Sequence, residues 1–391
     1  MVSEESYTTF NPLLAEVVGA SVFPEQVAAP LRQILRQTAH ARFIMGRVTR
    51  IDFDAREIEC ASLAGVTRLS YDDVVLAFGN HARLDFIPGL AEFALPLKTI
   101  GDAVEIRNVA LRRLARIELE DDPTLRSALG HFVVIGGGFS GVEVAGELLD
   151  CLKSVRRYYP RVRADEILVT LVHDLNALLP ELPASLGRIA EASLRRRGAD
   201  VRLGVRAASL SEDAVILSDG ATISTRCVIA TAGVKANPLA NGLGLEMRRG
   251  RIVVAPDMRA AGVEGVWVVG DCADIVNARD GATAPPTAQF AVREGRQLAD
   301  NILLAGKGQP TRPFTYRARG AMASIGRFDG VAEVFGIRLS GLVAWLLWRG
   351  YYLLQMPTFG RKLRIWVEWT WGMAFSADIT HLRFTKSSER S

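Results

Sequence analysis

The chain has 391 residues, 49% of them hydrophobic, and a formal net charge of only +4. The length exceeds that of one typical domain and the composition is that of a globular protein, so we expect two or three compact units and no extended disorder. A charge this small gives no argument for nucleic-acid binding, and the four scattered cysteines provide neither a disulfide framework nor a metal site: Cys60, Cys151, Cys227 and Cys272.

Short β-rich apolar runs alternate with helical patterns along the first three quarters of the chain. This order is typical of α/β units built on a largely parallel sheet. The helical patterns cover Val27 to Gln37, Gly101 to Glu118, Gly141 to Tyr158 and Thr287 to Leu304. The strand patterns cover Val74 to Phe78, Phe132 to Ile135, Ile167 to Val172, Val228 to Ala230 and Trp267 to Val269.

The stretch HFVVIGGGFSGVEVAGELLD, residues 131–150, combines an apolar strand, a glycine-rich turn and a helix. Its G-x-G-x-x-G consists of Gly136, Gly138 and Gly141. The first glycine allows the tight turn, the second lets the backbone approach a pyrophosphate, and the third allows close helix packing. Because the strand and the helix are both present, the motif predicts a dinucleotide site rather than a structural glycine turn.

The next predicted strand ends in His173 and Asp174. An acidic residue at such a position binds the ribose 2′-hydroxyl of NAD, and Asp174 would supply it one position late. No arginine follows at once to bind a 2′-phosphate. The sequence therefore favours NADH over NADPH.

A second nucleotide signal lies in VWVVGDCAD, residues 266–274, where an apolar strand ends in Gly270 and Asp271. Glycine lets the backbone pass close to a ligand, and an aspartate there accepts hydrogen bonds from a polyol such as a ribityl chain. The runs VVLAFG and VIATAG end in the same way, at Gly79 and Gly233. Alone, each is an ordinary turn, but together they favour a ligand site.

The last sixty residues contain five of the six tryptophans. Leu339 to Met356 is apolar almost all round but carries Arg349 near its middle, and burying that charge in a bilayer costs roughly 2.5 to 3.5 kcal/mol. We therefore expect a helix that lies on the membrane or dips into one leaflet, and that ends at Pro357. Basic residues then accompany three tryptophans suited to headgroup depth: Trp366, Trp369 and Trp371. A hydrophobic dimer interface is the alternative, and the two are compatible.

In this order, the motifs resemble those of the two-dinucleotide flavoprotein reductases and, among them, the type II NADH:quinone oxidoreductases. The resemblance covers nearly the whole chain and includes FNPLLAEVV (10–18), LPLKTIGDAVEIRN (95–108), GGGFSGVEVAGEL (136–148), VVGDCAD (268–274) and PPTAQFAVREG (285–295). It implies an α/β fold with two Rossmann-like domains and a C-terminal membrane-associating helical segment. It also implies that NADH passes a hydride to FAD and that two electrons then reach a membrane quinone, without proton pumping.

The resemblance divides the chain into four ranges. Residues 1–110 would be the first part of the FAD-binding domain, N-terminally incomplete, and 111–255 the NAD(P)H-binding domain that interrupts it. Residues 256–330 would be the second part of the FAD-binding domain, and 331–391 a membrane-associating or dimer segment.

Carried over by position, the resemblance also implies site residues. The cofactor-binding residues would be Pro12, Gly79, Gly136, Gly138, Gly141, His173, Asp174, Gly233, Gly270, Asp271 and Ala288. The catalytic residues would be Lys98, Glu143 and Gln289. Glu143 would lie where the nicotinamide meets the flavin, and Gln289 where the flavin meets the quinone. From the residues alone, Glu143 also fits a first-turn glutamate favoured by the helix dipole, and Gln289 a solvated helix residue.

The implied quinone site comprises Gln289, Arg293 and Arg319, and two of these depart from the family pattern. That pattern usually reads AQxAxQ, so Arg293 replaces a glutamine, and Arg319 stands where lysine is common. Arginine brings a fixed charge and a planar donor fork where an amide offers both a donor and an acceptor. Either Arg293 stabilises a reduced quinone anion, or it pairs with Glu294 on the surface.

The FAD half of this family begins with its own glycine-rich strand, turn and helix, and no such segment precedes FNPLL. We expect about 35 to 45 residues of a βαβ opening to be missing, through a start codon placed too late or a real truncation. For the 391-residue chain we accordingly expect weak or absent FAD binding.

The resemblance implies NAD(P)H and quinone as partners, a homodimer, and a peripheral position on the cytoplasmic face of the inner (plasma) membrane. Two alternatives remain: a soluble NAD(P)H-dependent flavoprotein reductase with a protein acceptor, and an inactive truncated homologue. The tryptophan-rich tail argues against the first. The scattered cysteines argue against sulfide or disulfide chemistry.

Overall fold

The computed structural model describes residues 1–36, 38–375 and 377–381. The chain divides into two compact units, each made of three segments that are far apart in the sequence. Unit 1 comprises Met1–Tyr7, Pro30–Ala82 and Val234–Arg319. Unit 2 comprises Thr8–Ala29, Arg83–Gly233 and Gly320–Ser391.

A five-stranded parallel sheet forms the centre of unit 2, in the order β12–β11–β10–β16–β9. Its strands are β9 (Ala94–Pro96), β10 (His131–Ile135), β11 (Leu168–Val172), β12 (Asp200–Arg202) and β16 (Cys227–Ala230). The last four residues of the middle strand β10 are buried and apolar, as expected for a parallel strand covered on both faces. The predicted strands at 132–135, 167–172 and 228–230 are confirmed to within a residue or two.

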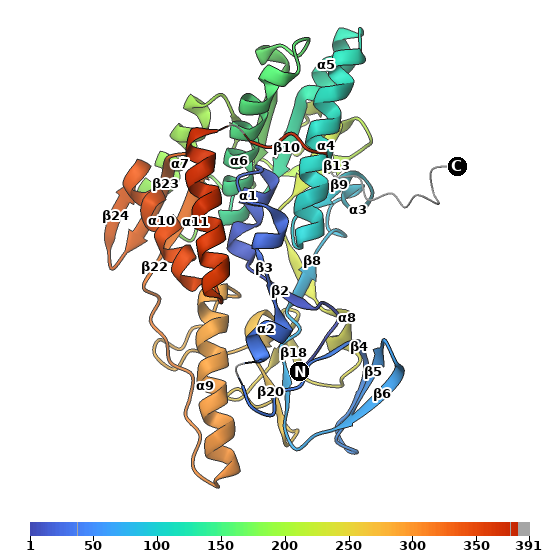
Figure 1. Cartoon of the computed structure of the whole chain (residues 1–391), viewed down its shortest axis with the longest axis vertical. Coiled ribbons are helices and arrows are strands. Elements are labelled where there is room, and N and C mark those ends of the chain that lie inside the picture. Colours follow the sequence, from blue (N-terminus) through green and yellow to red (C-terminus); the bar gives the residue numbers. More distant parts are fainter. Residues whose placement is uncertain (37, 376, 382–391) are drawn as a thin grey trace. The chain divides into compact units, whose positions relative to one another are not determined.

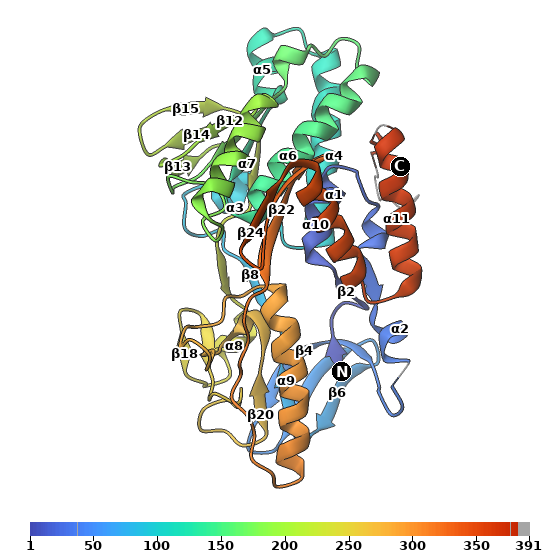
Figure 2. The same cartoon turned by 90° about the vertical axis from the view of Figure 1, so that its left-hand side faces the viewer.

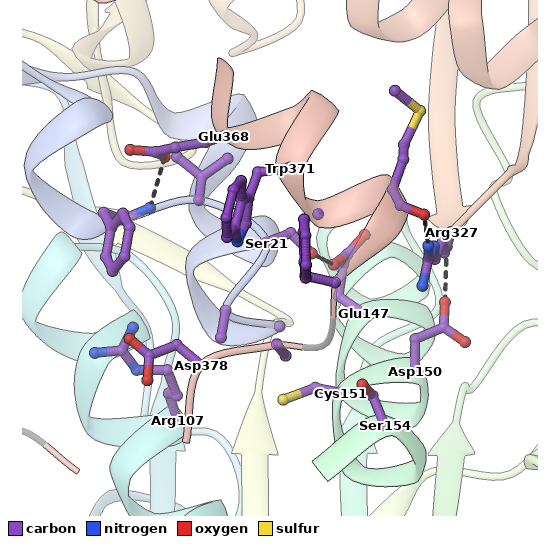
Figure 3. A pocket seen from close by; sticks show the side chains of 18 of the residues that line it. Ser21, Arg107, Glu147, Asp150, Cys151, Ser154, Arg327, Glu368, Trp371 and Asp378 are labelled. Atoms are coloured by element: carbon purple, nitrogen blue, oxygen red, sulfur yellow. Dashed lines mark hydrogen bonds between the residues drawn. The ribbon is translucent and has the colours of Figure 1, made fainter. Parts of the chain in front are cut away.

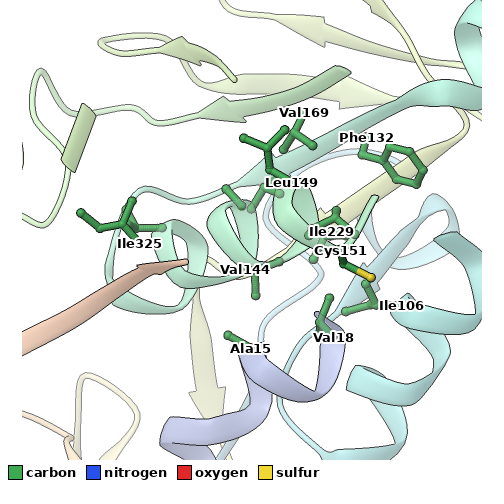
Figure 4. Close-up of a cluster of buried hydrophobic side chains, with 14 of the residues drawn as sticks. Ala15, Val18, Ile106, Phe132, Val144, Leu149, Cys151, Val169, Ile229 and Ile325 are labelled. Carbon is green, nitrogen blue, oxygen red and sulfur yellow. The ribbon is translucent and has the colours of Figure 1, made fainter. Parts of the chain in front are cut away.

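Helices accompany this sheet: α1 (Leu14–Val18), α3 (Leu90–Phe93), α4 (Ile100–Leu119), α5 (Pro123–Gly130), α6 (Phe139–Val155) and α7 (Ala184–Arg196). A capping box starts α4, since Asp102 N donates to Thr99 Oγ1 at 3.1 Å and Thr99 N donates to Asp102 Oδ2 at 2.8 Å. α1 packs against both α4 and α6 (Figure 1). Their apolar side chains form one core with β10 and β11, in which Val18 lies beside Ile106 and Ala15 lies below Val144 (Figure 4).

Two antiparallel sheets complete unit 2 (Figure 2). One consists of β13 (Ala207–Leu210), β14 (Ala214–Leu217) and β15 (Thr222–Ser224), and the other of β22 (Gly320–Gly326), β23 (Asp329–Val334) and β24 (Ile337–Ser340). β22 lies directly on α6: a Cβ at Gly146 would be 2.0 Å from the Ile325 carbonyl oxygen, so only glycine fits there. The sheet β22–β24 therefore packs on the helix that follows the glycine loop.

The tryptophan-rich tail forms two helices that pack on each other, α10 (Gly341–Gln355) and α11 (Phe359–Ala374). The predicted helix in 339–356 is confirmed from Gly341 onward. Of the segment 331–391, residues 376 and 382–391 lie outside the described part. Among the helices that the structure describes, none combines the length and the apolar character needed to cross a membrane.

Unit 1 is built from smaller sheets. β1 (Val2–Ser3) pairs in parallel with β4 (Ile44–Asp52), which continues into the antiparallel strands β5 (Glu57–Ser62) and β6 (Gly65–Ser70). β7 (Val74–Leu76) and β20 (Val266–Val268) form a parallel pair. The other elements are β8 (Asn80–Ala82), β17 (Val234–Ala236), β18 (Met247–Arg248), β19 (Arg251–Val253), β21 (Ala273–Asp274), α2 (Leu31–Leu35), α8 (Pro238–Asn241) and α9 (Ala288–Gly306).

The helix predicted at 27–37 is wrong in its first part. Ala28–Pro30 forms strand β3, paired with β2 (Tyr7–Thr9), and helix α2 covers only Leu31–Leu35. Pro30 is extended, with φ −61° and ψ 122°, and a proline disfavours helical backbone in the residue before it. Gln37 lies outside the described residues.

The contact-based units differ from the ranges 1–110, 111–255, 256–330 and 331–391. Residue 110 lies inside α4, whose buried residues belong to the core of unit 2. The segment after residue 331 also belongs to unit 2. The assignment of ranges to FAD and NAD(P)H remains a proposal.

Candidate functional site

The three predicted glycines meet where β10 turns into α6. Gly136 has a φ of +116°, and its N–H donates to the Val172 carbonyl oxygen at 2.9 Å. A Cβ at Gly141 would be 1.7 Å from the Gly136 carbonyl oxygen, so the turn closes only around glycine. Gly138 precedes the first turn of α6, and no side chain caps that turn. The free N–H groups and the helix dipole therefore face outward, where an anion such as pyrophosphate binds.

His173, Asp174 and Gly233 follow β11 and β16, so they lie at the same edge of the parallel sheet as Gly136. His173 is only 9% exposed, and its Nδ1 lies 3.2 Å from Asp174 Oδ1. Burial lowers the pKa of His173. Unit 2 thus brings six predicted residues to one edge of the parallel sheet: the three glycines of the loop, His173, Asp174 and Gly233.

A second edge lies in unit 1, at the ends of the parallel strands β7 and β20. Gly79 and Gly270 follow these strands with φ values of +65° and +74°, a region that favours glycine. Open space lies beside Gly79, since a Cβ there would meet no atom within 4 Å. Gly270 N donates to Glu294 Oε2 at 2.9 Å, and burial raises the pKa of Glu294 to about 7.

This second edge fits a flavin. α9, which begins at Ala288, packs against the turn that contains Gly270 and Asp271. The glycine turns allow close approach of a ligand, Asp271 offers a carboxylate for ribityl hydroxyls, and no side chain caps the N-terminus of α9. Four predicted residues therefore share this edge: Gly79, Gly270, Asp271 and Ala288.

Pro12, predicted to bind the cofactor, and Lys98, predicted to be catalytic, lie in unit 2 rather than in unit 1. Pro12 lies in the short turn before α1, and Lys98 precedes α4, where its N–H donates to Asp102 Oδ2 at 2.9 Å. Their flavin and catalytic roles remain proposals.

Of the two alternatives for Arg293, the surface pair with Glu294 is wrong. The Arg293 guanidinium lies over the Tyr316 ring, 5.3 Å from its centroid, and donates through Nη1 to the Gln289 carbonyl oxygen at 3.3 Å. Glu294 is 3% exposed and accepts from Gly270 on another face of α9, because consecutive helical side chains point in different directions. Arg319 is exposed on the segment that follows α9.

Glu143 is buried on the outer face of α6, with 8% exposure. Its Oε1 accepts from Trp348 Nε1 at 3.1 Å and from Ser324 N at 3.2 Å. Burial raises the pKa of Glu143 to about 8, so it holds a proton at neutral pH. The carboxyl thus contacts β22 and α10, and its role beside the nicotinamide remains a proposal.

Two more buried carboxyls lie close by. Ser21 Oγ donates to Glu147 Oε2 at 2.7 Å, and burial raises the pKa of Glu147 to about 8. Trp369 Nε1 donates to Glu16 Oε2 at 2.6 Å. Glu16, Glu143 and Glu147 are called the buried carboxyl cluster below.

Arg349 is the cation of this cluster. Its Nη2 lies 3.7 Å from Glu16 Oε1, and its guanidinium lies 3.8 Å from the Trp345 ring centroid and 4.7 Å from that of Trp369. Burial also raises the pKa of Glu16, and Arg349 opposes that effect. We expected the positive charge of Arg349 to lie near a membrane surface. In the structure it is instead paired with Glu16 inside the protein.

This cluster was not predicted from the sequence, although α6 carries a signal for it. Glu143 and Glu147 are four residues apart and so share one helix face. A cavity of about 420 Å³ lies beside the cluster, lined by Glu147, Arg107, Cys151, Arg349 and Trp371 among others (Figure 3).

Known proteins resemble the chain over most of its length. Residues 1–295 match the family model described as pyridine nucleotide-disulphide oxidoreductase. The type II NADH:quinone oxidoreductase Ndh of Mycobacterium tuberculosis is 30% identical over 383 residues, which are 95% of this chain and 81% of that protein. The internal alternative NAD(P)H-ubiquinone oxidoreductase A1 of Solanum tuberosum mitochondria is 30% identical over 97% of this chain and 82% of its own.

The solved structure of NDH2 from Plasmodium falciparum in complex with NADH has a similar fold. Its TM-score is 0.90 at 17% identity, with 97% of this chain and 94% of that chain covered.

Proposed function

The chain belongs to the pyridine nucleotide-disulphide oxidoreductase family and, within it, to the type II NADH:quinone oxidoreductases, and on this premise we propose that it moves electrons from NADH through FAD to a quinone. The observation that carries the proposal is the uncapped N-terminus of α6 behind Gly136, Gly138 and Gly141. The backbone N–H groups there bind the NADH pyrophosphate.

FAD is the implied prosthetic group, and it supplies the two-electron chemistry between hydride donor and quinone. In unit 1, Gly79 and Gly270 would allow close approach of the FAD chain, and Asp271 would accept hydrogen bonds from its ribityl hydroxyls. Ala288 and Gln289 lie in the first turn of α9, whose N-terminus favours negative charge. Lys98, Pro12 and Glu143, which lie in unit 2, are proposed as catalytic or cofactor-binding residues from the family resemblance alone.

Arg293 is the proposed departure in quinone recognition. Stacking on Tyr316 and the bond to the Gln289 carbonyl oxygen hold its guanidinium beside the first turn of α9. A fixed cation there stabilises a quinol anion, whereas the glutamine usual in the family does not. Arg319 would add a second positive charge.

The decisive experiment is an NADH oxidation assay with the purified chain at saturating FAD, because weak FAD binding is expected of the 391 residues. We expect oxidation that depends on ubiquinone or menaquinone analogues, and the Arg293→Gln variant should change the ratio of rates with the two. Activity confined to soluble protein acceptors would instead support the alternative flavoprotein reductase.

The proposed place of the protein is a membrane surface, on the cytoplasmic side of the inner (plasma) membrane. α10 and α11 bury Trp345, Trp348 and Trp369 within unit 2 but expose other apolar side chains. Exposed are Leu342, Val343, Leu346, Leu354, Phe359, Leu363, Trp366, Val367 and Trp371. So many apolar side chains on two helices mark an interaction surface, and Lys362 and Arg364 beside them suit anionic headgroups.

Flotation with vesicles of phosphatidylglycerol and phosphatidylethanolamine tests this surface. We expect the wild-type chain to float, and the Leu363→Ser/Trp366→Ser variant to stay at the bottom with its NADH affinity intact. Val66→Ser is a matched control, because Val66 is exposed on β6 in unit 1. If the variant floats but loses its dimer in sedimentation, the surface is a subunit interface.

A further inference from the structure

We propose that the cavity of about 420 Å³ beside α11 is a second ligand site, which binds a carboxylate with a long apolar chain through the Arg107 guanidinium. All the residues that line this cavity belong to unit 2. On α6 the cavity reaches Cys151, which is roughly 20 Å along the helix axis from Gly138 in the glycine loop. The site therefore lies apart from the dinucleotide loop, and the inference goes beyond the proposed function.

Arg107 lies on the cavity wall as a buried side chain without a partner. Only 4% of its surface is exposed, and its Nε is buried with no hydrogen-bond partner. Among the described residues, its guanidinium forms neither a hydrogen bond nor an ion pair. Burial lowers the pKa of Arg107, but arginine keeps its charge in proteins. Because a buried, unpaired cation is costly, a bound anion would offset a cost that the folded chain otherwise carries.

The two other arginines on the wall already have acceptors. Arg349 Nη2 lies 3.7 Å from Glu16 Oε1, and Arg327 Nη2 donates to the Met373 carbonyl oxygen. A ligand anion would thus meet one unsatisfied guanidinium. The planar donor fork of a guanidinium matches the two oxygens of one carboxylate.

Acidic side chains on the wall limit the ligand to a single negative charge. Burial raises the pKa of Glu147 to about 8 and that of Glu368 to about 7, so both are wholly or partly protonated at neutral pH. Asp150 lies 2.5 Å from Arg197 Nη2 and is compensated by it. Asp378 is exposed and favours the charged guanidinium from the cavity rim. A doubly charged phosphate would be repelled by Asp378 and Asp150, and a carboxylate less so.

Apolar side chains form the mouth of the cavity. Val367, Trp371, Met373 and Phe375 line it, and each is 40% to 62% exposed. Figure 3 shows Trp371 on α11, away from Arg107 on α4. The carboxylate would therefore bind at the buried wall, with the apolar chain directed toward α11.

The size and the position of the cavity suit such a ligand. Ligand pockets have volumes of roughly 300 to 1,000 Å³, and this cavity falls within that range. The helix that forms its mouth also carries Leu363 and Trp366 of the proposed membrane surface. An amphiphile dissolved in a membrane would reach the cavity from that side.

Titration calorimetry with decanoate and decanol tests the site on the whole chain. The two compounds share their apolar chain and differ in charge. We expect the wild-type chain to bind decanoate at least about tenfold more tightly than decanol. Arg107→Met should remove this preference and leave the affinity for decanol unchanged, because methionine keeps the apolar stem without the charge. Arg112→Gln, at an exposed arginine of the same helix, should keep the preference.

Two further measurements separate ligand binding from folding. Arg107→Met should unfold at the same urea concentration as the wild-type chain or at a higher one, because it removes a buried, unpaired charge. Arg107→Lys keeps the charge without the planar fork, so its preference for decanoate should fall between those of the wild-type chain and Arg107→Met.

Three results would overturn the inference. The first is that the wild-type chain binds decanoate no more tightly than decanol, or that the preference survives in Arg107→Met. The second is a markedly lower urea midpoint of Arg107→Met, which would give Arg107 a structural partner instead of a ligand. The third is that Arg107→Met no longer floats with phosphatidylglycerol vesicles, which would make a phospholipid headgroup the ligand. None of these results bears on NADH oxidation by quinone analogues, which tests the proposed function separately.

Discussion

The two parts of helix α6 differ in the chemistry that they carry. At its N-terminus, backbone N–H groups behind three glycines form the proposed dinucleotide site, and no side chain caps them. Four to eight residues later, Glu143 and Glu147 lie buried under β22, α10 and the end of α1. The first part depends on local backbone geometry, whereas the second depends on segments almost two hundred residues away. Variants should therefore separate ligand affinity from the stability of unit 2.

The largest effect on stability is expected from Arg349→Met. The substitution removes the only cation within 4 Å of Glu16 among the described residues and leaves that carboxyl buried without its partner. The free energy of unfolding should fall by about 3 to 5 kcal/mol, measured by urea titration. The control Arg112→Gln, which breaks an exposed pair with Glu105, should cost less than about 1 kcal/mol. Equal losses in the two variants would contradict the buried pairing.

The next effect is expected from Glu143→Ala. It leaves Trp348 Nε1 and Ser324 N without their common acceptor, which should cost about 2 to 4 kcal/mol of unfolding free energy. Glu143→Gln keeps an oxygen acceptor and mimics the protonated acid, so it should cost much less. Similar unfolding midpoints for the two variants would show that the hydrogen bonds do not matter.

The third effect is the pH dependence of stability. Between pH 4.5 and pH 8, folded Glu143 and Glu147 each hold a proton that the unfolded chain has released. Their contribution is therefore complete below pH 4.5, falls by about 1.4 kcal/mol per pH unit per carboxyl as the pH rises, and is lost above pH 8. Urea titrations from pH 5 to 8.5 should show a clearly shallower decline for Glu143→Gln/Glu147→Gln than for the wild-type chain. Parallel curves would refute the raised pKa values.

The smallest effect on stability is expected at the other part of the helix. A Cβ at Gly138 meets only Glu181 Oε1, at 3.9 Å, so Gly138→Ala should change the free energy of unfolding by less than about 0.5 kcal/mol. The same methyl group projects where the backbone approaches the pyrophosphate, so the affinity for ADP-ribose should fall about tenfold or more. Arg349→Met should leave that affinity unchanged while the protein is folded. If Gly138→Ala and Arg349→Met both lose affinity for ADP-ribose in titration calorimetry, the two parts of α6 do not act separately.

The sequence predicted the first part of α6 well and the second part poorly, for a physical reason. Gly136, Gly138 and Gly141 act through backbone geometry within six residues, so a local pattern is sufficient evidence. The burial of Glu143 depends on Ser324 and Trp348, and no local pattern indicates which distant segment covers a helix face. The same limit explains why the partners of Arg349 were not predicted. The sequence shows only a charge within an apolar helix, whereas the structure places Glu16 and two indole rings beside it. One of the two alternatives for Arg293 paired it with its sequence neighbour Glu294, but helix geometry directs Glu294 to Gly270.

The buried carboxyl cluster also bears on how the protein is made. During synthesis, the whole parallel sheet of unit 2 is made well before residues 320–381. The face of α6 that carries Glu143 and Glu147 is therefore exposed to water until residues 320–381 have been synthesised. While this face is exposed, ionised Glu143 and Glu147 keep it polar and disfavour its association with other nascent chains. When β22, α10 and α11 close over it, Glu143 and Glu147 each take up a proton. The last step in assembling unit 2 is therefore expected to consume protons and to slow as the medium becomes alkaline.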